Sequence, residues 1–481
     1  MKLYIVFLFL GINILANAQV EIVWGTAVNV APSSNDNLHP RLALDGSGNP
    51  LVLWGKSSNQ AMFSRWSGSA FTAAVPLNPM DIPVFTASWA GPDLAANGDT
   101  VYAIFKQTPE DEGSMYMVSS TDGGMNWSEE VQVENIGDSL SRFPTLAIDG
   151  EGNPMVAFMK FNSAFGDAQW VVTRSNDLGQ TFVPDVPASG FGNATVCDCC
   201  PGSIVASGNQ AALLYRNNAS NIRDTWAAIS TDNGASFPDA VNVDQENWML
   251  MSCPSSGPDG IILGDTLYSV FMNGATGTSF VYLSKTSLMD VSSDGGVALT
   301  GDFPGMSNQN FIRIAHSGNA AVSVWKQTVN SQSQLALLYT NDITNGWPNE
   351  YVVPVPMHVV NMDVAMSDNN IYLVWQDDNS GTVRYMKGVV SEPTALNSAS
   401  SEQHLNIYPN PFSSNLNVSV PSTMNVLLTL EVRDAMGKTV LTLENISNHK
   451  QIDLSALSPG IYMLTTLTET THYSERIIKR D

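Results

Sequence analysis

The chain repeats one pattern of apolar and polar residues. In each copy, a short segment of alternating apolar residues leads into a tight turn, and a second, more continuously apolar segment follows. Runs of this kind, separated by turn residues, predict antiparallel β-strands. The first strands are expected to begin near His39, Gly91, Phe143, Pro201, Gly257, Phe311 and Asn361, and the second strands to end near Trp54, Phe105, Met159, Tyr215, Phe271, Trp325 and Trp375. The pattern therefore predicts seven units of similar structure.

A shorter repeat lies within three of these units. A serine, an aspartate, a glycine and an aromatic residue recur with a spacing of 55 residues from serine to serine. A fixed period of this length indicates an array of similar supersecondary units. The aspartate can accept hydrogen bonds from nearby backbone amides, and the glycine supplies the positive φ of a tight turn, so we expect structural roles. The copies are Ser120, Asp122, Gly124 and Trp127; Ser175, Asp177, Gly179 and Phe182; and Ser230, Asp232, Gly234 and Phe237.

This short repeat resembles the Asp-box of sialidase-type β-propellers, where the box lies between the third and fourth strands of a blade. The resemblance implies an all-β propeller. The count of units favours seven blades, with six, the usual number in that family, as the alternative. The seventh unit has expected strands near 361–367, 371–376 and 382–389 but no fourth, whereas residues 21–30 predict a lone strand before the first unit. We expect this N-terminal strand to complete the last blade and close the ring.

The N-terminus predicts export. Residues 1–18 contain Lys2, an apolar run and the small-residue signal Ala16-Asn17-Ala18, a combination typical of a secretory signal peptide. No other stretch reaches the roughly 18 apolar residues that a membrane span needs. Residues 19–391 are therefore assigned to the propeller, and residues 392–403, rich in Pro, Ser, Ala and Asn, to a linker.

A different pattern fills residues 404–481. It contains, in order, Tyr408-Pro409-Asn410-Pro411, then Asp434 with Gly437-Lys438, then Gly460-Ile461-Tyr462, and a basic end at Lys479-Arg480. This series resembles the C-terminal sorting domain of the type IX secretion system, a small β-sandwich. The resemblance implies passage across the outer membrane to the cell surface or the medium, with the secretion machinery as a partner.

Net charge narrows the choice of partners. The chain has 45 acidic and 21 basic residues, for a net charge of -24. Such a chain is repelled by phosphate backbones and anionic lipids, so we expect neither nucleic-acid nor membrane-surface binding. We expect a monomer. The low proportion of charged residues, 14%, suits many short strands joined by tight turns.

The cysteines form the first candidate site. All four lie before the first strands of the fourth and fifth units, as Cys197, Cys199, Cys200 and Cys253. Neighbouring blades would bring these loops to one rim of the channel. In an exported protein, four cysteines suggest disulfides with three alternative pairings, one of which joins Cys197 to Cys200. A thiolate site for copper or zinc is the second hypothesis, since four soft ligands would gather there. A reactive thiol is the third.

Basic residues near the channel mouth form the second candidate site. Arg41, Arg142 and Arg313 lie at or near the starts of first strands, and the fourth unit adds Arg216, Arg223 and Asp224 close to the cysteines. Cations around a channel mouth would attract a carboxylate or sulfate. Arginines on separate blades resemble the carboxylate clamp of sialidases, and Arg41, Arg142, Arg216 and Arg313 are expected to point into one pocket. For catalysis, Asp36 is the candidate acid, and Tyr268 or Tyr385 the candidate nucleophile.

These observations lead to three functional hypotheses. The first is a secreted or cell-surface propeller that recognises an acidic glycan or a similar anion at its channel mouth. The second is an exo-glycosidase of the sialidase type. The third is a non-catalytic interaction propeller whose rim carries a copper or zinc ion or a disulfide-braced loop. No further cofactor is expected.

Overall fold

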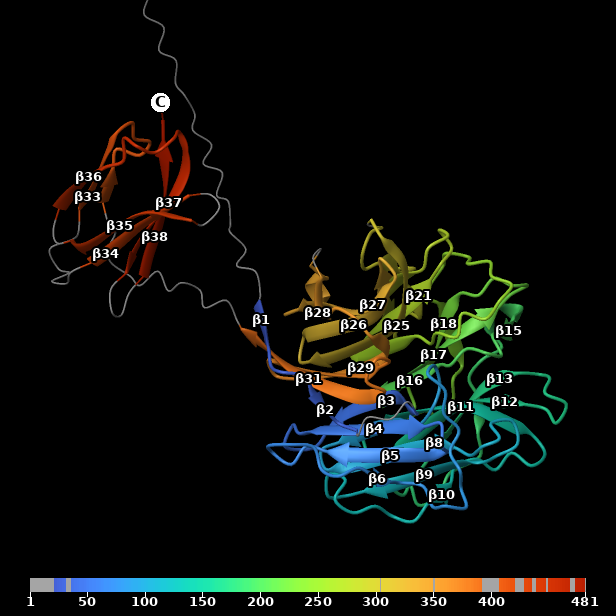
Figure 1. Ribbon diagram of the computed structural model, residues 1–481. Coiled ribbons are helices and arrows are strands. Elements are labelled where there is room, and N and C mark those ends of the chain that lie inside the picture. Colours follow the sequence, from blue (N-terminus) through green and yellow to red (C-terminus); the bar gives the residue numbers. More distant parts are fainter. Residues whose placement is uncertain are drawn as a thin grey trace, which may run out of the picture. The chain divides into compact units, whose positions relative to one another are not determined.

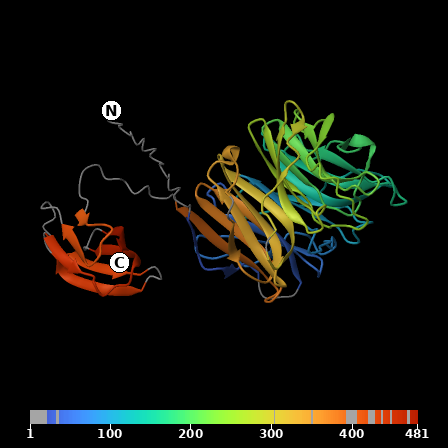
Figure 2. The same cartoon turned by 90° about the horizontal axis from the view of Figure 1, so that it is seen from above.

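The computed structural model describes residues 21–31, 36–302, 304–348, 351–391, 406–419, 428–434, 438–446, 449–467 and 472–480. The expected signal peptide (1–18) and linker (392–403) lie outside these residues. Contacts divide the chain into a unit spanning Gln19–Glu392 and a second that includes Pro393–Asp481. Apart from two short 3₁₀ helices, η1 (Phe191–Asn193) and η2 (Ile343–Asn345), the described elements are strands (Figures 1 and 2). No described helix has the length and apolar character needed to cross a membrane.

The described residues of the larger unit form seven antiparallel sheets. The first contains β3 (Asn37–Leu44), β4 (Pro50–Lys56), β5 (Gln60–Arg65) and β6 (Val75–Pro76). The second contains β7 (Asp93–Asn97), β8 (Thr100–Lys106), β9 (Met115–Ser120) and β10 (Val131–Gln132). The third contains β11 (Leu140–Ile148), β12 (Pro154–Phe161), β13 (Gln169–Arg174) and β14 (Val186–Pro187). The fourth contains β15 (Thr195–Val196), β16 (Ser203–Ser207), β17 (Gln210–Asn218), β18 (Thr225–Ser230) and β19 (Asp239–Asn242).

The remaining three sheets follow the same plan. The fifth contains β20 (Asp259–Leu263), β21 (Thr266–Asn273), β22 (Phe280–Ser287), β23 (Ser292–Ser293) and β24 (Val297–Ala298). The sixth contains β25 (Met306–Ser317), β26 (Ala320–Val329), β27 (Gln332–Thr340) and β28 (Val352–Val355). The seventh contains β29 (Val359–Ser367), β30 (Asn370–Asp377), β31 (Thr382–Ser391), and the N-terminal strands β1 (Glu21–Trp24) and β2 (Val28–Asn29).

These sheets form a closed ring. One strand of each sheet contacts its counterpart in the next sheet, in the order β3, β7, β11, β16, β20, β25, β29 and back to β3. Seven apolar clusters lie between neighbouring sheets. One of these seven joins the seventh sheet to the first and includes Val374, Tyr385, Val52 and Trp54. The prediction of a seven-bladed propeller is therefore confirmed, and the six-bladed alternative is wrong.

The ring closes as the sequence predicts. The N-terminal β1 pairs with β31 in antiparallel register from Glu21 opposite Ser391 to Trp24 opposite Gly388, and β2 pairs further along the same strand. In Figure 1 the blue N-terminal strands lie against the orange end of the last sheet. Both exposed sheet edges of an open array are removed by this exchange.

The three Asp-boxes lie between the third and fourth strands of the second, third and fourth blades. In the first box, the Ser120 hydroxyl donates to the Asp122 carboxylate (2.8 Å) and accepts from the backbone N–H of Gly124 (2.9 Å). The Asp122 carboxylate also accepts from the side-chain amide of Asn126 (2.7 Å) and from its backbone N–H (2.8 Å), and these hydrogen bonds lower the pKa of Asp122 to about 2. The expected structural role is thus observed.

The described residues of the C-terminal unit form two sheets. One contains β32 (Asn406–Tyr408), β33 (Asn415–Ser419) and β36 (His449–Asp453); the other contains β34 (Leu428–Arg433), β35 (Thr439–Ile446), β37 (Gly460–Leu467) and β38 (His472–Lys479). Buried apolar side chains, among them Phe412, Leu416, Leu430, Ile452 and Ile477, form its core. The unit therefore has a hydrophobic core of its own.

A buried lysine joins the second and third blades. The ammonium group of Lys106 donates to the carbonyl of Gly113 and to the Ser141 hydroxyl (2.8 Å), and Ser141 in turn donates to Glu134 (3.1 Å). Burial is the main cause that lowers the pKa of Lys106 to about 8. The folded protein therefore releases this proton at lower pH than the unfolded chain does.

This difference predicts a pH dependence of stability. Between pH 8 and 10 the unfolded chain binds more protons at this lysine, so the free energy of unfolding is expected to rise by about 2 kcal/mol. Urea unfolding at the two pH values measures the change. The variant Lys106→Met removes the titrating group and is expected to remove most of the rise. An equal rise in both proteins would contradict the assignment to Lys106.

Candidate functional site

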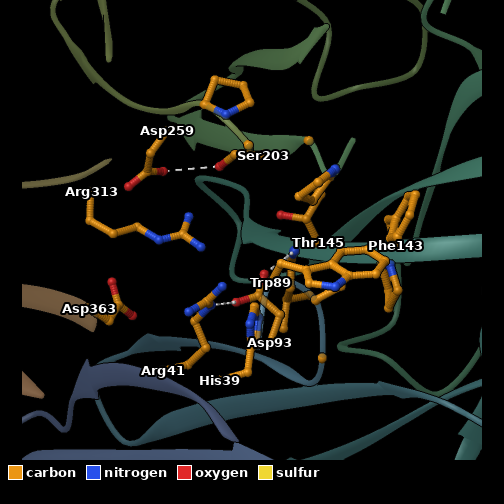
Figure 3. A pocket seen from close by; sticks show the side chains of 18 of the residues that line it. His39, Arg41, Trp89, Asp93, Phe143, Thr145, Ser203, Asp259, Arg313 and Asp363 are labelled. Atoms are coloured by element: carbon orange, nitrogen blue, oxygen red, sulfur yellow. Dashed lines mark hydrogen bonds and ion pairs between the residues drawn. The ribbon is translucent and has the colours of Figure 1, made fainter. Parts of the chain in front are cut away.

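A polar cavity of about 230 Å³ lies on the propeller axis, at the end where the first strands begin. The seven copies of the first-strand pattern each contribute their third residue to its wall (Figure 3). In blade order these are Arg41, Asp93, Thr145, Ser203, Asp259, Arg313 and Asp363, which we call the axial ring. The first residues of the copies also line the cavity, because the strands converge there.

Acceptors of the axial ring join neighbouring blades. Asp93 accepts from the backbone N–H of Leu146 in the next blade (2.9 Å), and Asp363 accepts from that of Leu42 (2.9 Å). The same contact recurs from Asp259 to the N–H of Ile314 (3.1 Å). Each N–H belongs to the residue directly after a ring position. These carboxylates therefore have a structural task in holding the blades together.

The two arginines of the axial ring differ in their partners. The guanidinium of Arg41 lies 3.6 Å from the Asp93 carboxylate and donates to the carbonyl of Pro40 (2.8 Å). Burial and the nearby charge of Arg313 lower the pKa of Arg41 to about 10. Arg313 has no carboxylate within ion-pair distance among the described residues, and its guanidinium projects into the cavity (Figure 3). Arg313 therefore makes no direct ion pair there, although Asp259 and Asp363 interact with its charge at longer range.

Aromatic and imidazole groups form part of the cavity wall. Trp89 and Phe143 pack edge to face, with ring centroids 5.5 Å apart, and Phe311 lies on the sixth blade. His39 is buried, and its pKa lies well below the ordinary value because of burial and the charges of Arg41 and Arg313. Burial likewise raises the pKa of Asp259 and Asp363. The cavity thus combines apolar ring faces with two arginines and three aspartates.

The four-arginine clamp expected from the sequence does not form. Arg41 and Arg313 line the cavity, whereas Arg142 and Arg216 do not. Arg142 pairs with Glu110 (2.5 Å) and lies over the ring of Phe143. Arg216 is buried between the fourth and fifth blades, where it donates to the carbonyls of Arg223 and Met272. The guanidinium groups of Arg142 and Arg216 therefore contact other parts of the protein and do not face the axial cavity.

The other two residues of this set, Arg223 and Asp224, are also buried. Arg223 donates to the carbonyl of Leu250 (2.8 Å) and to the sulfur of Cys197 (2.9 Å). Asp224 accepts from the backbone N–H of Trp248 (3.0 Å) and from Asn242 (3.0 Å). They belong to the surroundings of the cysteines and not to the axial cavity.

The expected catalytic residues lie away from the cavity. Asp36 accepts from Ser58 (2.8 Å) and lies 3.5 Å from Lys56. Tyr268 packs in the apolar cluster between the fifth and sixth blades, and Tyr385 packs against Trp66 between the seventh and the first. Burial raises the pKa of both tyrosines. The structure therefore does not bring this acid and these nucleophiles together.

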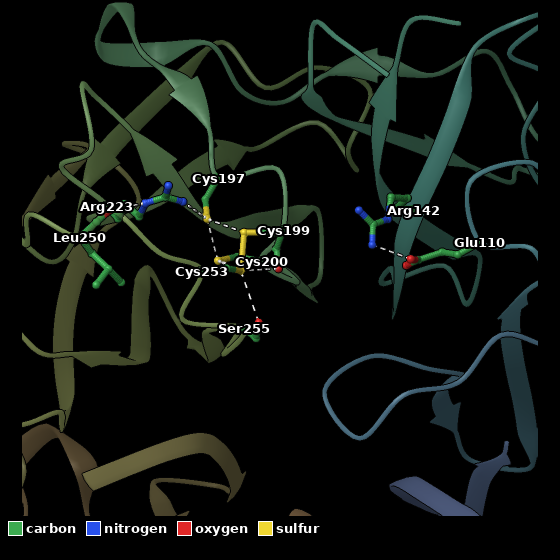
Figure 4. The surroundings of a disulfide bond; sticks show 9 residues. All are labelled: Glu110, Arg142, Cys197, Cys199, Cys200, Arg223, Leu250, Cys253 and Ser255. Atoms are coloured by element: carbon green, nitrogen blue, oxygen red, sulfur yellow. Dashed lines mark hydrogen bonds and ion pairs between the residues drawn. A yellow bond between two sulfur atoms is a disulfide. The ribbon is translucent and has the colours of Figure 1, made fainter. Parts of the chain in front are cut away.

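The four cysteine sulfurs gather at one place (Figure 4). All four Sγ atoms lie within 4.8 Å of one another, and a disulfide joins Cys199 to Cys253. Cys197 and Cys200 are buried thiols whose sulfurs are 2.7 Å apart. The hydrogen bond with Cys200 and the charge of Arg223 lower the pKa of Cys197 to about 6, and burial raises the pKa of Cys200 well above its ordinary value. Pro201, which follows Cys200, lines the axial cavity.

Sequence reasoning missed the carboxylates of the axial ring and the aromatic residues beside it. The signal was present: the third residues of the seven aligned copies are all polar or charged, in segments that are largely apolar. Trp89 has no such signal because it precedes the second copy of the pattern.

Comparisons with known proteins agree with this architecture. Residues 406–480 match the family model described as a secretion system C-terminal sorting domain. The protein is therefore a β-propeller with a type IX sorting domain, and this domain marks it for secretion or display at the cell surface. No curated protein sequence matches the chain.

Solved structures resemble it at low sequence identity. One is a polysaccharide lyase of family PL25, an ulvan lyase, with 11% identity and a TM-score of 0.50, covering 78% of this chain and 100% of the lyase. An α-L-arabinofuranosidase from Fusarium graminearum has 12% identity and a TM-score of 0.45, covering 67% and 98%. An intramolecular trans-sialidase from Ruminococcus gnavus has 11% identity and a TM-score of 0.45, covering 66% and 100%.

Proposed function

We propose that this protein is a secreted saccharide-binding propeller that holds an anionic sugar unit in its axial cavity. The observation that carries the proposal is the guanidinium of Arg313, which projects into the cavity without a carboxylate partner within ion-pair distance in the described part of the chain. Guanidinium binds carboxylate and sulfate oxygens in a bidentate manner. Arg313 is thus the anchor for the ligand's charged group.

The size and lining of the cavity support the same ligand class. A volume of about 230 Å³ is below the range of pockets for drug-sized ligands, so it suits one sugar unit of a longer chain. Trp89, Phe143 and Phe311 offer apolar ring faces beside the arginine. The ulvan lyase with the same fold was solved bound to -[GlcA(1-4)Rha3S]-, a repeat that carries a uronate and a sulfate ester.

The protein is expected to bind the saccharide without cleaving it. The cavity lining contains no tyrosine among the described residues, and the carboxylates Asp93, Asp259 and Asp363 accept backbone N–H groups from neighbouring blades. A sialidase-type reaction needs a tyrosine nucleophile beside the scissile bond. Incubation of the protein with acidic oligosaccharides is therefore expected to release no new reducing ends. Their appearance at a rate proportional to the protein would contradict this part of the proposal.

Calorimetric titration with oligosaccharides of the GlcA–Rha3S repeat tests the binding site. Replacement of Arg313 by glutamine is expected to weaken binding at least tenfold, because a charge-assisted hydrogen bond contributes about 1.5–3 kcal/mol. The matched control is Arg174→Gln, which removes an arginine that bonds Asn176 on the third blade. Oligosaccharides with reduced carboxyls and no sulfate should bind poorly to the parent protein and to the Arg313→Gln variant. Equal affinity of the Arg313→Gln variant and the parent protein would refute the site.

A further inference from the structure

The cysteine cluster has the donor set of a metal site. Its sulfurs come from two loops, one leading into the fourth blade and one into the fifth. Two of the sulfur–sulfur distances, Cys197 to Cys199 (3.7 Å) and Cys200 to Cys253 (3.9 Å), are close to the edge of a tetrahedron with metal–sulfur bonds of about 2.3 Å. That edge is about 3.8 Å.

The backbone around the cluster holds the two loops in place. The N–H of Cys197 donates to the carbonyl of Arg216 (2.9 Å), which fixes the first loop to β17. The N–H of Leu250 donates to the carbonyl of Asn221 (2.9 Å), which fixes the second loop to the same blade. Arg223 connects both loops, since it bonds the carbonyl of Leu250 and the sulfur of Cys197 (Figure 4). The sulfurs are therefore preorganised by the fold.

Two positively charged side chains, Arg216 and Arg223, lie near the sulfurs. Arg216 and Arg223 are buried, and in the described part of the chain neither has a carboxylate within 4.0 Å. The closest partner of the Arg223 guanidinium that can carry a negative charge is the Cys197 sulfur, at 2.9 Å. Buried cations are costly without an anion nearby. The charge of Arg216 acts on Cys197 and Cys200 and also on the buried carboxylate of Asp244. Arg223, with part of the charge of Arg216, would therefore offset part of the negative charge of a thiolate cluster.

We propose that the reduced cluster binds one zinc ion as a tetrathiolate of Cys197, Cys199, Cys200 and Cys253. Four thiols give up four protons when they bind Zn²⁺, and the product has a charge of −2, which the nearby guanidinium groups partly offset. Copper(I) with the same four thiolates would have a charge of −3. Charge balance and the tetrahedral preference of zinc therefore favour zinc over copper.

The disulfide between Cys199 and Cys253 determines when a zinc ion can bind to the cluster. Cys199 and Cys253 are joined in the structure, so the ion must bind before this bond forms or after a dithiol reduces it. In the second case the dithiol becomes a disulfide, and the protein gains two thiols. The competing outcome is a loop braced by disulfides alone. This inference is independent of the saccharide proposal, because it concerns a different set of side chains.

The test uses the full chain. The protein is reduced with dithiothreitol, freed from it under argon and incubated with ZnCl₂; bound zinc is then measured by mass spectrometry and free thiols with a chromogenic disulfide. We expect one zinc per chain and four thiols protected from the reagent. Cobalt(II) in place of zinc should give the intense visible bands and thiolate charge-transfer absorption of a tetrahedral sulfur site.

Two variants separate ligation from folding. Cys253→Ser removes the ligand from the second loop and is expected to weaken zinc binding at least a hundredfold, with melting of the propeller recorded in parallel. Arg223→Gln keeps all four sulfurs and is expected to weaken binding about tenfold, whereas the control Arg174→Gln has no effect. The proposal is overturned if the reduced parent protein binds less than a tenth of an equivalent of zinc, or if Cys253→Ser binds zinc as tightly as the parent.

Discussion

Removal of residues 19–31 is expected to lower the melting temperature of the propeller by about 6 °C or more. This segment supplies β1 and β2, which complete the seventh blade against β31. Its deletion removes the backbone hydrogen bonds along β31 and the burial of Val30 and Ala31, and it exposes the apolar surface beneath Trp24. Backbone hydrogen bonds of about 1 kcal/mol each, together with lost burial, give a loss of roughly 5 kcal/mol or more. A loss of that size approaches the total stability of many domains.

Calorimetry of the two truncated proteins provides the measurement. The control deletes residues 393–481, which belong to the other compact unit, and the melting transition of the propeller is expected to stay within about 2 °C of the parent. The N-terminal deletion should also associate at high concentration, since an unpaired β31 offers an open sheet edge. A propeller that melts at the parent temperature without residues 19–31 would show that ring closure contributes little.

The prediction of the propeller from sequence succeeded because its information is local. Each blade is a series of strands joined by short turns, so the alternation of apolar residues and the turn signals identify it within about 50 residues. The closure was also predictable, because a lone strand at residues 21–30 and a blade lacking its fourth strand complement one another. The pairing of two distant segments could thus be predicted because one end of the propeller has an extra strand and the other end lacks one.

The candidate site was predicted only in part, and strand register explains why. Arg41 and Arg313 are the third residues of their copies and face the axis. Arg142 lies one residue before its copy, and a bulge in β11 separates it from the ring position at Thr145. A shift of one residue turns a side chain to the other face of a strand, and a bulge changes the count again. Counting arginines near strand starts therefore could not separate the two groups.

The hydrogen-bond partners of the side chains also could not be predicted from the sequence. Arg216 lies near the end of β17, much as Lys56 and Lys106 lie at the ends of β4 and β8, but its guanidinium is buried against the carbonyls of Arg223 and Met272. Those acceptors come from a loop of the same blade and a strand of the next one. The packing of two neighbouring blades decides their position, and this packing depends on residues far apart in the sequence.

Substitution of Gly124 by alanine is expected to destabilise the propeller by about 3 kcal/mol. Gly124 belongs to the first Asp-box and has a φ of +77°, and an added Cβ would lie 2.5 Å from the ring of Phe63 in the preceding blade. Phe63 is buried and packs edge to face on Trp127 of the same box, with centroids 5.0 Å apart, so the ring cannot move away. Left-handed backbone strain contributes about 1 kcal/mol, and overpacking adds roughly 1–3 kcal/mol.

The matched control for this prediction is Gly98→Ala. Gly98 has a φ of +61° in the turn between β7 and β8, and no atom lies within 4 Å of an added Cβ. This variant should lose only the backbone component, about 1 kcal/mol, so the difference between the two alanine variants in urea unfolding isolates the contact with Phe63. Equal losses would mean that the Asp-box closes its own turn without supporting the neighbouring blade. A larger loss for Gly124→Ala would show that the box also fixes how one blade packs on the next.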